Sequence, residues 1–164
     1  MPAEAPFLKT AGELTNWRAC YRDIALTNGC FDLLHCGHVE YLMAACQKAH
    51  EMGLPLLVAI NSDDSVTRLK GPGRPINPME HRARILCALR CVDAVTWFAE
   101  DTPIDLVMEV RPHLLVKAED YKDKPIVGSD FVKSTGGLVW LAPFRQGVST
   151  TETVRKGGTS GDCS

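Results

Sequence analysis

Thr27-Asn28-Gly29-Cys30-Phe31-Asp32-Leu33-Leu34-His35-Cys36-Gly37-His38 is the stretch of sequence that decides the fold. It follows an apolar run at residues 23–27, which predicts a first β-strand that ends in the Asn28-Gly29 turn signal. A helical pattern follows at residues 39–52, with Leu42, Cys46 and Ala49 on one face. The stretch therefore forms a loop between a strand and the start of a helix.

Strands and helices alternate along the rest of the chain. Further strands are expected at 56–60, 94–98, 113–117 and 138–141, and helices at 78–89, 103–110 and 150–156, with a helical turn at 128–135. Asn77 is expected to cap the helix that Pro78 begins. Residues 61–77 are polar and are expected to be a connecting stretch that ends in a loop. This order predicts an α/β fold: a Rossmann-like, doubly wound, parallel five-stranded sheet with helices on both faces.

The length and composition favour one folded domain. The chain has 164 residues, of which 45% are hydrophobic and 23% are charged, enough for a core and ordinary for a globular protein. Residues 1–21 are expected to form a helical extension through Leu14, Trp17 and Cys20. Residues 22–156 form the predicted domain. Residues 157–164 are rich in glycine and serine and are expected to be a disordered tail.

Charge and cysteine usage exclude several classes of protein. The formal net charge of -2 provides no global basic field, so we expect no nucleic-acid partner. No run approaches the roughly 20 apolar residues of a membrane span, and the first ten residues lack the apolar core of a signal peptide. The seven cysteines are irregularly spaced, which is typical of free thiols in a reducing compartment. The sequence predicts a cytoplasmic protein without a membrane segment.

The candidate site lies at the carboxyl ends of the strands, where parallel sheets bind ligands. His35 and His38 are three residues apart at a helix start, so their rings should face the same side. Gly37 lets a ligand approach the backbone, and the free N–H groups of the helix start favour an anion. This pattern suits a triphosphate. Two alternatives remain: ordinary polar residues at a helix start, or a metal site that adds Cys30 and Cys36, whose spacing fits no common zinc pattern.

Two later stretches fall at the same edge of the predicted sheet. Arg68-Leu69-Lys70-Gly71-Pro72-Gly73-Arg74 has three cations among glycines and is interpreted as a mobile loop that grips phosphate. The alternative is a solvated basic loop. Gln146-Gly147-Val148-Ser149-Thr150-Thr151 joins the last strand to the last helix and offers hydroxyls and helix-start amides to a second anion. The alternative there is simple capping by Ser149 or Thr150.

Residues 29–38 match the GxFDxxHxGH signature, and residues 148–151 match the ISTT signature. Through this pair the chain resembles the cytidylyltransferase-like nucleotidyltransferases over residues 24–156. Within them it is similar to the bacterial D-glycero-β-D-manno-heptose 1-phosphate adenylyltransferases. That similarity rests on residues 27–32, 61–63, 68–71, 74–78, 100–103 and 114–117. The resemblance implies transfer of AMP from ATP to the heptose phosphate, with release of pyrophosphate, for lipopolysaccharide core or related surface glycans.

The resemblance also implies the partners and the roles of residues. It implies ATP and a sugar 1-phosphate as ligands, Mg²⁺ bound mainly through the triphosphate with no protein ligand, and a homodimer or larger homo-oligomer. The implied catalytic residues are His35, His38 and Lys70. The implied nucleotide-binding residues are Cys30, Phe31, His35, Gly37, His38, Gly147, Val148, Ser149, Thr150 and Thr151. The implied substrate-binding residues are Asn28, Asp32, Lys70, Arg74, Lys117, Asp120 and Tyr121.

The chain departs from that family at one point, and other functions stay open. Ala118 and Glu119 stand where the family usually has two glycines, which adds side chains near the expected acceptor pocket. A related enzyme that uses CTP, of the glycerol-3-phosphate cytidylyltransferase type, would share the same motifs. A nucleotide-binding regulatory protein without catalysis, or a purely structural α/β domain, are the alternatives from other classes.

Overall fold

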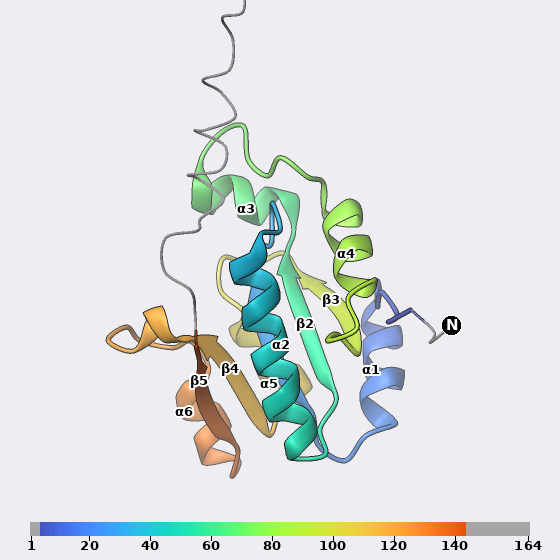
Figure 1. Ribbon diagram of the computed structural model, residues 1–164, viewed down its shortest axis with the longest axis vertical. Coiled ribbons are helices and arrows are strands. Elements are labelled where there is room, and N and C mark those ends of the chain that lie inside the picture. Colours follow the sequence, from blue (N-terminus) through green and yellow to red (C-terminus); the bar gives the residue numbers. More distant parts are fainter. Residues whose placement is uncertain (1–3, 144–164) are drawn as a thin grey trace, which may run out of the picture.

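The computed structural model of the protein describes residues 4–143 (Figure 1). Its five strands form one parallel sheet in the order β3-β2-β1-β4-β5, which confirms the predicted Rossmann-like fold. The strands are β1 (Ala25–Gly29), β2 (Leu56–Asn61), β3 (Ala94–Phe98), β4 (Leu114–Ala118) and β5 (Leu138–Ala142). The helices are α1 (Ala11–Ala19), α2 (Cys36–Glu51), α3 (Asp63–Lys70), α4 (Met79–Cys87), α5 (Ile104–Val110) and α6 (Ser129–Ser134), with a 3₁₀ turn, η1 (Glu119–Tyr121).

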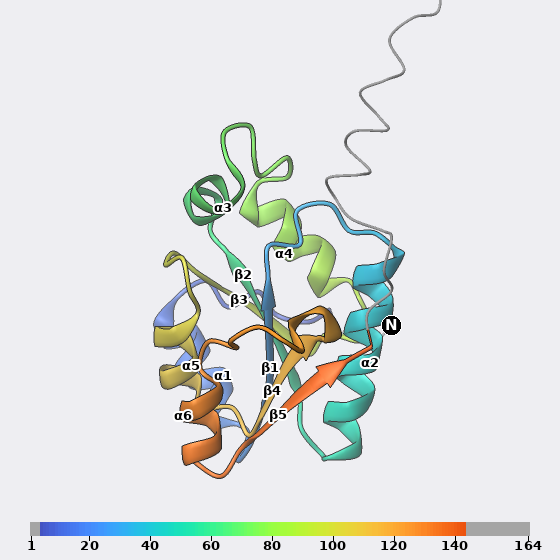
Figure 2. The ribbon, with the colours of Figure 1, turned by 90° about the vertical axis from the view of Figure 1, so that its left-hand side faces the viewer.

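Helices cover both faces of the sheet, and each face has its own apolar core. Side chains of α2 and α4 pack on one face, and side chains of α1, α5 and α6 pack on the other. Figure 2 shows α2 on one side of the sheet and α1, α5 and α6 on the opposite side. The strand β2, which lies between β3 and β1, is buried along its whole length, as its continuous apolar run predicts.

The parallel register brings the carboxyl ends of the strands together. Gly29 of β1 lies opposite Ile60 of β2, and Thr27 lies opposite both Val58 and Val116. The loops that leave these ends therefore meet at one edge of the sheet, which is the edge where the ligand site was predicted.

The N-terminal residues reach the sheet at its β3 edge. Leu8 donates its N–H to the carbonyl of Val95 at 2.8 Å, and Phe7 bridges to the same residue. The helix α1 that follows has a capping box, in which Thr10 and Glu13 satisfy each other's backbone N–H groups. Leu14 of α1 is buried in the second core.

Two expectations for residues 61–77 are wrong. Residues 63–70 form the helix α3, whose first turn is capped by Ser62. Only Ser65 and Val66 of this helix are buried, and six of its eight residues are polar, so its sequence gives little apolar signal for a helix. Asn77 does not cap α4, because its side-chain amide donates to the carbonyl of Asp32 at 3.0 Å instead. The predicted helix at 150–156 and the tail at 157–164 lie outside the described residues.

Two glycine-to-alanine substitutions should differ in their effect on the stability of the fold. A Cβ at Gly137 would lie 2.9 Å from the carbonyl oxygen of His113 and 3.0 Å from that of Pro112, so Gly137→Ala should destabilise the fold. We expect a loss of about 1–3 kcal/mol, typical of overpacking. A Cβ at Gly12 of α1 meets nothing closer than 3.9 Å, so Gly12→Ala should be neutral or slightly stabilising. Urea unfolding of both variants checks the pair, and equal midpoints would contradict it.

Candidate active site

One cavity of about 490 Å³ opens at the carboxyl edge of the sheet. Its walls come from the loop after β1, the end of β2, the last turn of α3, the loop after β3, and the segment from β4 to residue 127. The lining residues are Asn28, Gly29, Cys30, Phe31, Asp32, His38, Tyr41, Asn61, Leu69, Lys70, Asp101, Thr102, Pro103, Lys117, Ala118, Asp120, Tyr121, Pro125 and Val127.

The two histidines lie side by side at the start of α2, as their spacing predicts. Their rings stack with centroids 3.8 Å apart, and the ring of Phe31 lies 5.3 Å from that of His38. His35 is the N-cap of α2, and its Nδ1 accepts the N–H of His38 at 3.4 Å. His35 therefore also has the structural role that was the alternative for a polar residue at a helix start, whereas His38 lines the cavity.

Both imidazoles have depressed pKa values. Burial lowers the pKa of His38 to about 4, with further lowering by His35 and Lys70, while a backbone hydrogen bond at Leu33 opposes the shift. Burial also lowers the pKa of His35. At neutral pH both rings are uncharged in the unliganded protein. They offer hydrogen bonds to an anion, and an arriving triphosphate would raise their pKa values by attraction.

The depressed pKa of His38 predicts how stability depends on pH. An unfolded histidine has a pKa near 6.5, so between pH 6.5 and about 4 the unfolded chain binds more protons at this position than the folded chain. Stability from this residue should therefore fall as the pH drops through that window. In His38→Asn the melting temperature should fall less over the same window, and thermal scans of both proteins check this. Parallel curves would contradict the low pKa.

Asp32 joins the loop after β1 to the segment before α4. Its carboxylate accepts the N–H groups of Ile76 at 2.7 Å and Asn77 at 3.0 Å, and it pairs with Arg74 at 2.8 Å. The Asp32 side chain is fully buried and that of Arg74 is 14% exposed. The geometry gives both residues a structural role, holding the two loops together. Their implied contact with substrate stays a prediction.

Arg82 of α4 makes a second group of buried hydrogen bonds between segments around the cavity, and sequence reasoning did not predict this role. Its guanidinium donates to the carbonyls of Cys30 at 2.6 Å, Asn61 at 2.8 Å and Asn77 at 3.0 Å, and to the carboxylate of Asp63 at 2.7 Å. Arg82 thus fixes three segments around the cavity. The available signal was a charged residue four positions before the apolar Leu86, on the buried stripe of α4.

The three cations at residues 68–74 do not act as one mobile loop, which corrects that interpretation. Arg68 and Lys70 belong to the last turn of α3. Arg68 bonds to the carboxylate of Asp101 at 2.7 Å and to the carbonyl of Ala99 at 2.6 Å, and Arg74 pairs with Asp32. Lys70 lines the cavity, which is the position expected of a phosphate contact.

Lys117, Asp120 and Tyr121 also line the cavity, near Asn28. The ammonium of Lys117 donates to the side-chain oxygen of Asn28 and lies 5.4 Å from the centre of the Tyr121 ring. Ala118 is a lining residue, whereas Glu119 is not. The charge that departs from the family pattern therefore stays off the cavity wall in the described structure.

The structure tests only part of the predicted site. Cys30, Phe31 and His38 all line the cavity, and Gly37 is buried in the first turn of α2. Residues 147–151 lie outside the described residues. Sequence reasoning missed the lining residues Tyr41, Asn61, Asp101, Thr102 and Pro103.

Metal and membrane features were searched for among the described residues. Within residues 4–143, no three His, Cys, Asp or Glu side chains form a group that could hold a metal ion. Over the same residues, no helix has the length and apolar character needed to cross a membrane.

Comparison with known proteins points to one family. The family model described as Cytidylyltransferase-like matches residues 26–156. The protein named bifunctional protein HldE from Gluconacetobacter diazotrophicus is 47% identical over 146 residues, which cover 89% of this chain and 29% of that protein. HldE from Coxiella burnetii is 51% identical over 139 residues, which cover 85% and 28%. The chain thus spans under a third of the length of these relatives.

Solved structures show the same fold at lower identity. The lipopolysaccharide core biosynthesis protein from Thermoplasma volcanium GSS1 superposes with a TM-score of 0.56 at 23% identity, covering 77% of this chain and 98% of that one. The macrolide-efflux protein from Streptococcus pneumoniae superposes with a TM-score of 0.58 at 22% identity, covering 81% and 50%.

Proposed function

This chain belongs to the cytidylyltransferase-like family of nucleotidyltransferases, and from that premise we propose that it transfers AMP from ATP to D-glycero-β-D-manno-heptose 1-phosphate. The products are ADP-glycero-manno-heptose and pyrophosphate. The observation that carries the proposal is His38, which stacks on His35 and lines the same cavity as Lys70 and Lys117. The identity of 47–51% with the HldE proteins supports the choice of heptose among the acceptors.

The reaction needs no protein base, because the sugar phosphate brings its own anionic oxygen. The protein has to hold the attacking phosphate in line with the α-phosphate of ATP and to stabilise the charge that develops there. We assign this role to His38 and Lys70, which both line the cavity. Mg²⁺ held mainly by the triphosphate would supply further positive charge to the phosphates.

The site residues fit a metal ion held mainly by the nucleotide. Asp32, the carboxylate nearest the histidine loop, is already bonded to Arg74, Ile76 and Asn77. Asp101 is paired with Arg68. Asp32 and Asp101 are therefore engaged within the protein, and Asp120, 4.0 Å from Lys124, is the remaining carboxylate that lines the cavity.

A cytoplasmic location is part of the proposal and is supported by six free cysteines among the described residues. A homodimer or larger homo-oligomer stays a prediction.

Pyrophosphate release tests the proposed function directly. The protein is incubated with Mg²⁺ and ATP, CTP, GTP or UTP, each with D-glycero-β-D-manno-heptose 1-phosphate, with glycerol 3-phosphate, or with no acceptor. Release that requires both ATP and the heptose phosphate is the expected result. Release with CTP and glycerol 3-phosphate would replace this function by the cytidylyltransferase alternative. Tight nucleotide binding with no release for any acceptor would favour a regulatory protein.

A further inference from the structure

A second, smaller cavity opens at the edge of the sheet where the strands begin. Its volume is about 160 Å³, and its lining residues are Arg18, Asp23, Arg111, Pro112, His113 and Thr135. They come from the last turn of α1, the segment before β1, the segment between α5 and β4, and the C-cap of α6. Because His113 lies just before β4 and Ala118 ends it, this cavity and the candidate active site lie at opposite ends of one strand.

Arg18 is held in place with part of its guanidinium unused. Its Nε donates to the carbonyl of Val110 at 2.8 Å. Its Nη1 and Nη2 donate to the carbonyls of Tyr21 at 2.6 Å and Arg22 at 3.3 Å. A guanidinium has five N–H donors, so two remain for a ligand. Because three bonds fix the group before a ligand arrives, binding costs little further side-chain entropy.

Arg111 supplies a second guanidinium, which the fold does not need. The residue is the C-cap of α5 and has a φ of 49°, in the left-handed region where glycine is the usual residue. Within residues 4–143 its side chain makes no hydrogen bond or ion pair, and it lies 5.6 Å from the centre of the Phe131 ring. Two carbonyls at the end of α5 already have donors, since Val107 accepts the N–H of Arg111 and Val110 accepts from Arg18.

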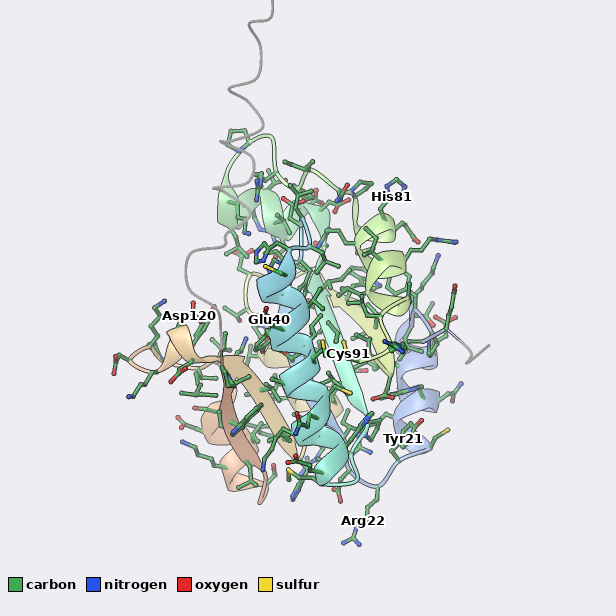
Figure 3. The ribbon with its side chains drawn as sticks, viewed as in Figure 1. Tyr21, Arg22, Glu40, His81, Cys91 and Asp120 are labelled. Atoms are coloured by element: carbon green, nitrogen blue, oxygen red, sulfur yellow. The ribbon has the colours of Figure 1, made fainter. Side chains whose placement is uncertain are left out.

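The charge of this cavity favours an anion, but one carboxylate also lines it. Arg18 and Arg111 bring two positive charges and His113 brings an imidazole, against the single carboxylate of Asp23. An oxygen of Asp23 lies 3.7 Å from Nε of Arg22, which is beyond hydrogen-bond distance. Figure 3 shows Arg22 pointing away from the body of the molecule, and its side chain is 97% exposed. Asp23 therefore remains a hydrogen-bond acceptor at a cavity that is otherwise rich in donors.

One acceptor among several donors selects between anions. Inorganic phosphate keeps a proton on one oxygen at neutral pH, so it can donate a hydrogen bond to a carboxylate while its other oxygens accept from guanidinium groups. Sulfate carries no proton at this pH, and its oxygens would be repelled by the lone pairs of Asp23. A phosphate monoester has lost most of its second proton at pH 7 and has the same disadvantage. The chemistry of the cavity therefore fits free phosphate better than other oxyanions.

We propose that this cavity is a binding site for hydrogen phosphate, the form of inorganic phosphate that keeps one proton. The guanidinium groups of Arg18 and Arg111 bind its oxygens, and the ring of His113 offers a further nitrogen. The carboxylate of Asp23 accepts the hydrogen bond from the protonated oxygen and so excludes sulfate. The proposal is independent of the nucleotidyltransferase function, because none of these residues lines the candidate active site.

Titration of the isotope-labelled protein with phosphate and with sulfate, followed by NMR at neutral pH and constant ionic strength, tests the site. The backbone amides of residues 111, 113 and 135 report this cavity, whereas those of residues 28–38 report the candidate active site. Arg111→Gly removes the guanidinium and suits the left-handed backbone, so the fold should be kept. Arg90→Gly is the matched control, because Arg90 is exposed and lines neither cavity. Asp23→Asn replaces the acceptor by an amide that can also donate.

Phosphate should shift the amides of residues 111, 113 and 135 in the wild type, and sulfate should bind there about 10-fold more weakly, the effect of one lost charged hydrogen bond. Arg111→Gly should weaken phosphate binding about 10- to 100-fold, whereas Arg90→Gly should leave it unchanged. Asp23→Asn should raise the affinity for sulfate. Thermal melting verifies that each variant is folded. Phosphate shifts confined to residues 28–38, or sulfate binding as tight as phosphate binding in the wild type, would overturn the proposal.

Discussion

His38→Ala is expected to lower turnover about 100- to 1,000-fold, the effect of removing one hydrogen-bond donor aimed at a transition state. The residue lies in the cavity between the ring of His35 at 3.8 Å and that of Phe31 at 5.3 Å, so its orientation is fixed before a ligand arrives. Its pKa of about 4 keeps the ring neutral at pH 7. The variant loses a hydrogen bond that stabilises the charge developing at the α-phosphate in the transition state. The loss should therefore appear in kcat.

The fold should survive this change, because the His38 ring is neutral at pH 7 and its removal therefore breaks no ion pair. His81→Ala is the matched control: Figure 3 shows His81 at the start of α4, pointing away from the sheet, and the residue is exposed. Pyrophosphate release under saturating ATP and sugar phosphate measures kcat for both variants. His35→Ala would be a poorer test, because it also removes the N-cap of α2. Full activity of His38→Ala would refute the catalytic role assigned to the loop after β1.

The sheet could be predicted because its signals are local. Each strand is a short apolar run, and the buried run of β2 at Leu56–Asn61 differs plainly from the periodic pattern of α2. The helix α3 could not be predicted in the same way. It buries Val66 and little else, and its stability comes from the Ser62 cap and from acidic residues in its first turn.

The histidine pair could be predicted for the same reason, since three positions along one helix start fix the spacing of two rings. The hydrogen bonds that hold the walls of the cavity together could not be predicted. Asn77 is a residue type that often caps helices, but its side-chain amide donates instead to the carbonyl of Asp32, 45 positions away. The partner of the Asn77 side chain depends on how the loop after β1 and the segment before α4 meet in space. A single sequence does not give the distance between them.

Arg82 is the clearest case, because three of its four acceptors belong to other parts of the chain and the fourth, Asn77, lies just before its own helix. In sequence it is one charged residue among several in residues 79–90. In the structure it is 1% exposed and joins the loop after β1 to the end of β2 and to α3. The cavity walls that carry Cys30 and Asn61 are therefore held by a group that need not touch a ligand.

Arg82→Met should destabilise the protein by about 3–5 kcal/mol, because the carbonyls of Cys30, Asn61 and Asn77 lose their donor in a buried place. Asp63 adds less, since its side chain is 44% exposed and can be hydrated. Methionine fills similar volume, so the loss reports hydrogen bonds rather than a cavity.

Urea unfolding measures the effect, with Arg84→Met as the matched control, because Arg84 lies on the same helix and is exposed. Turnover of the folded fraction of Arg82→Met should also fall, since a displacement of about 1 Å in positioning groups can cost roughly 100-fold. Equal urea midpoints for the two variants would show that water replaces the guanidinium at little cost. Arg82 would then be a replaceable bridge, and the position of the Cys30 loop would have to depend on the Asp32–Arg74 pair alone.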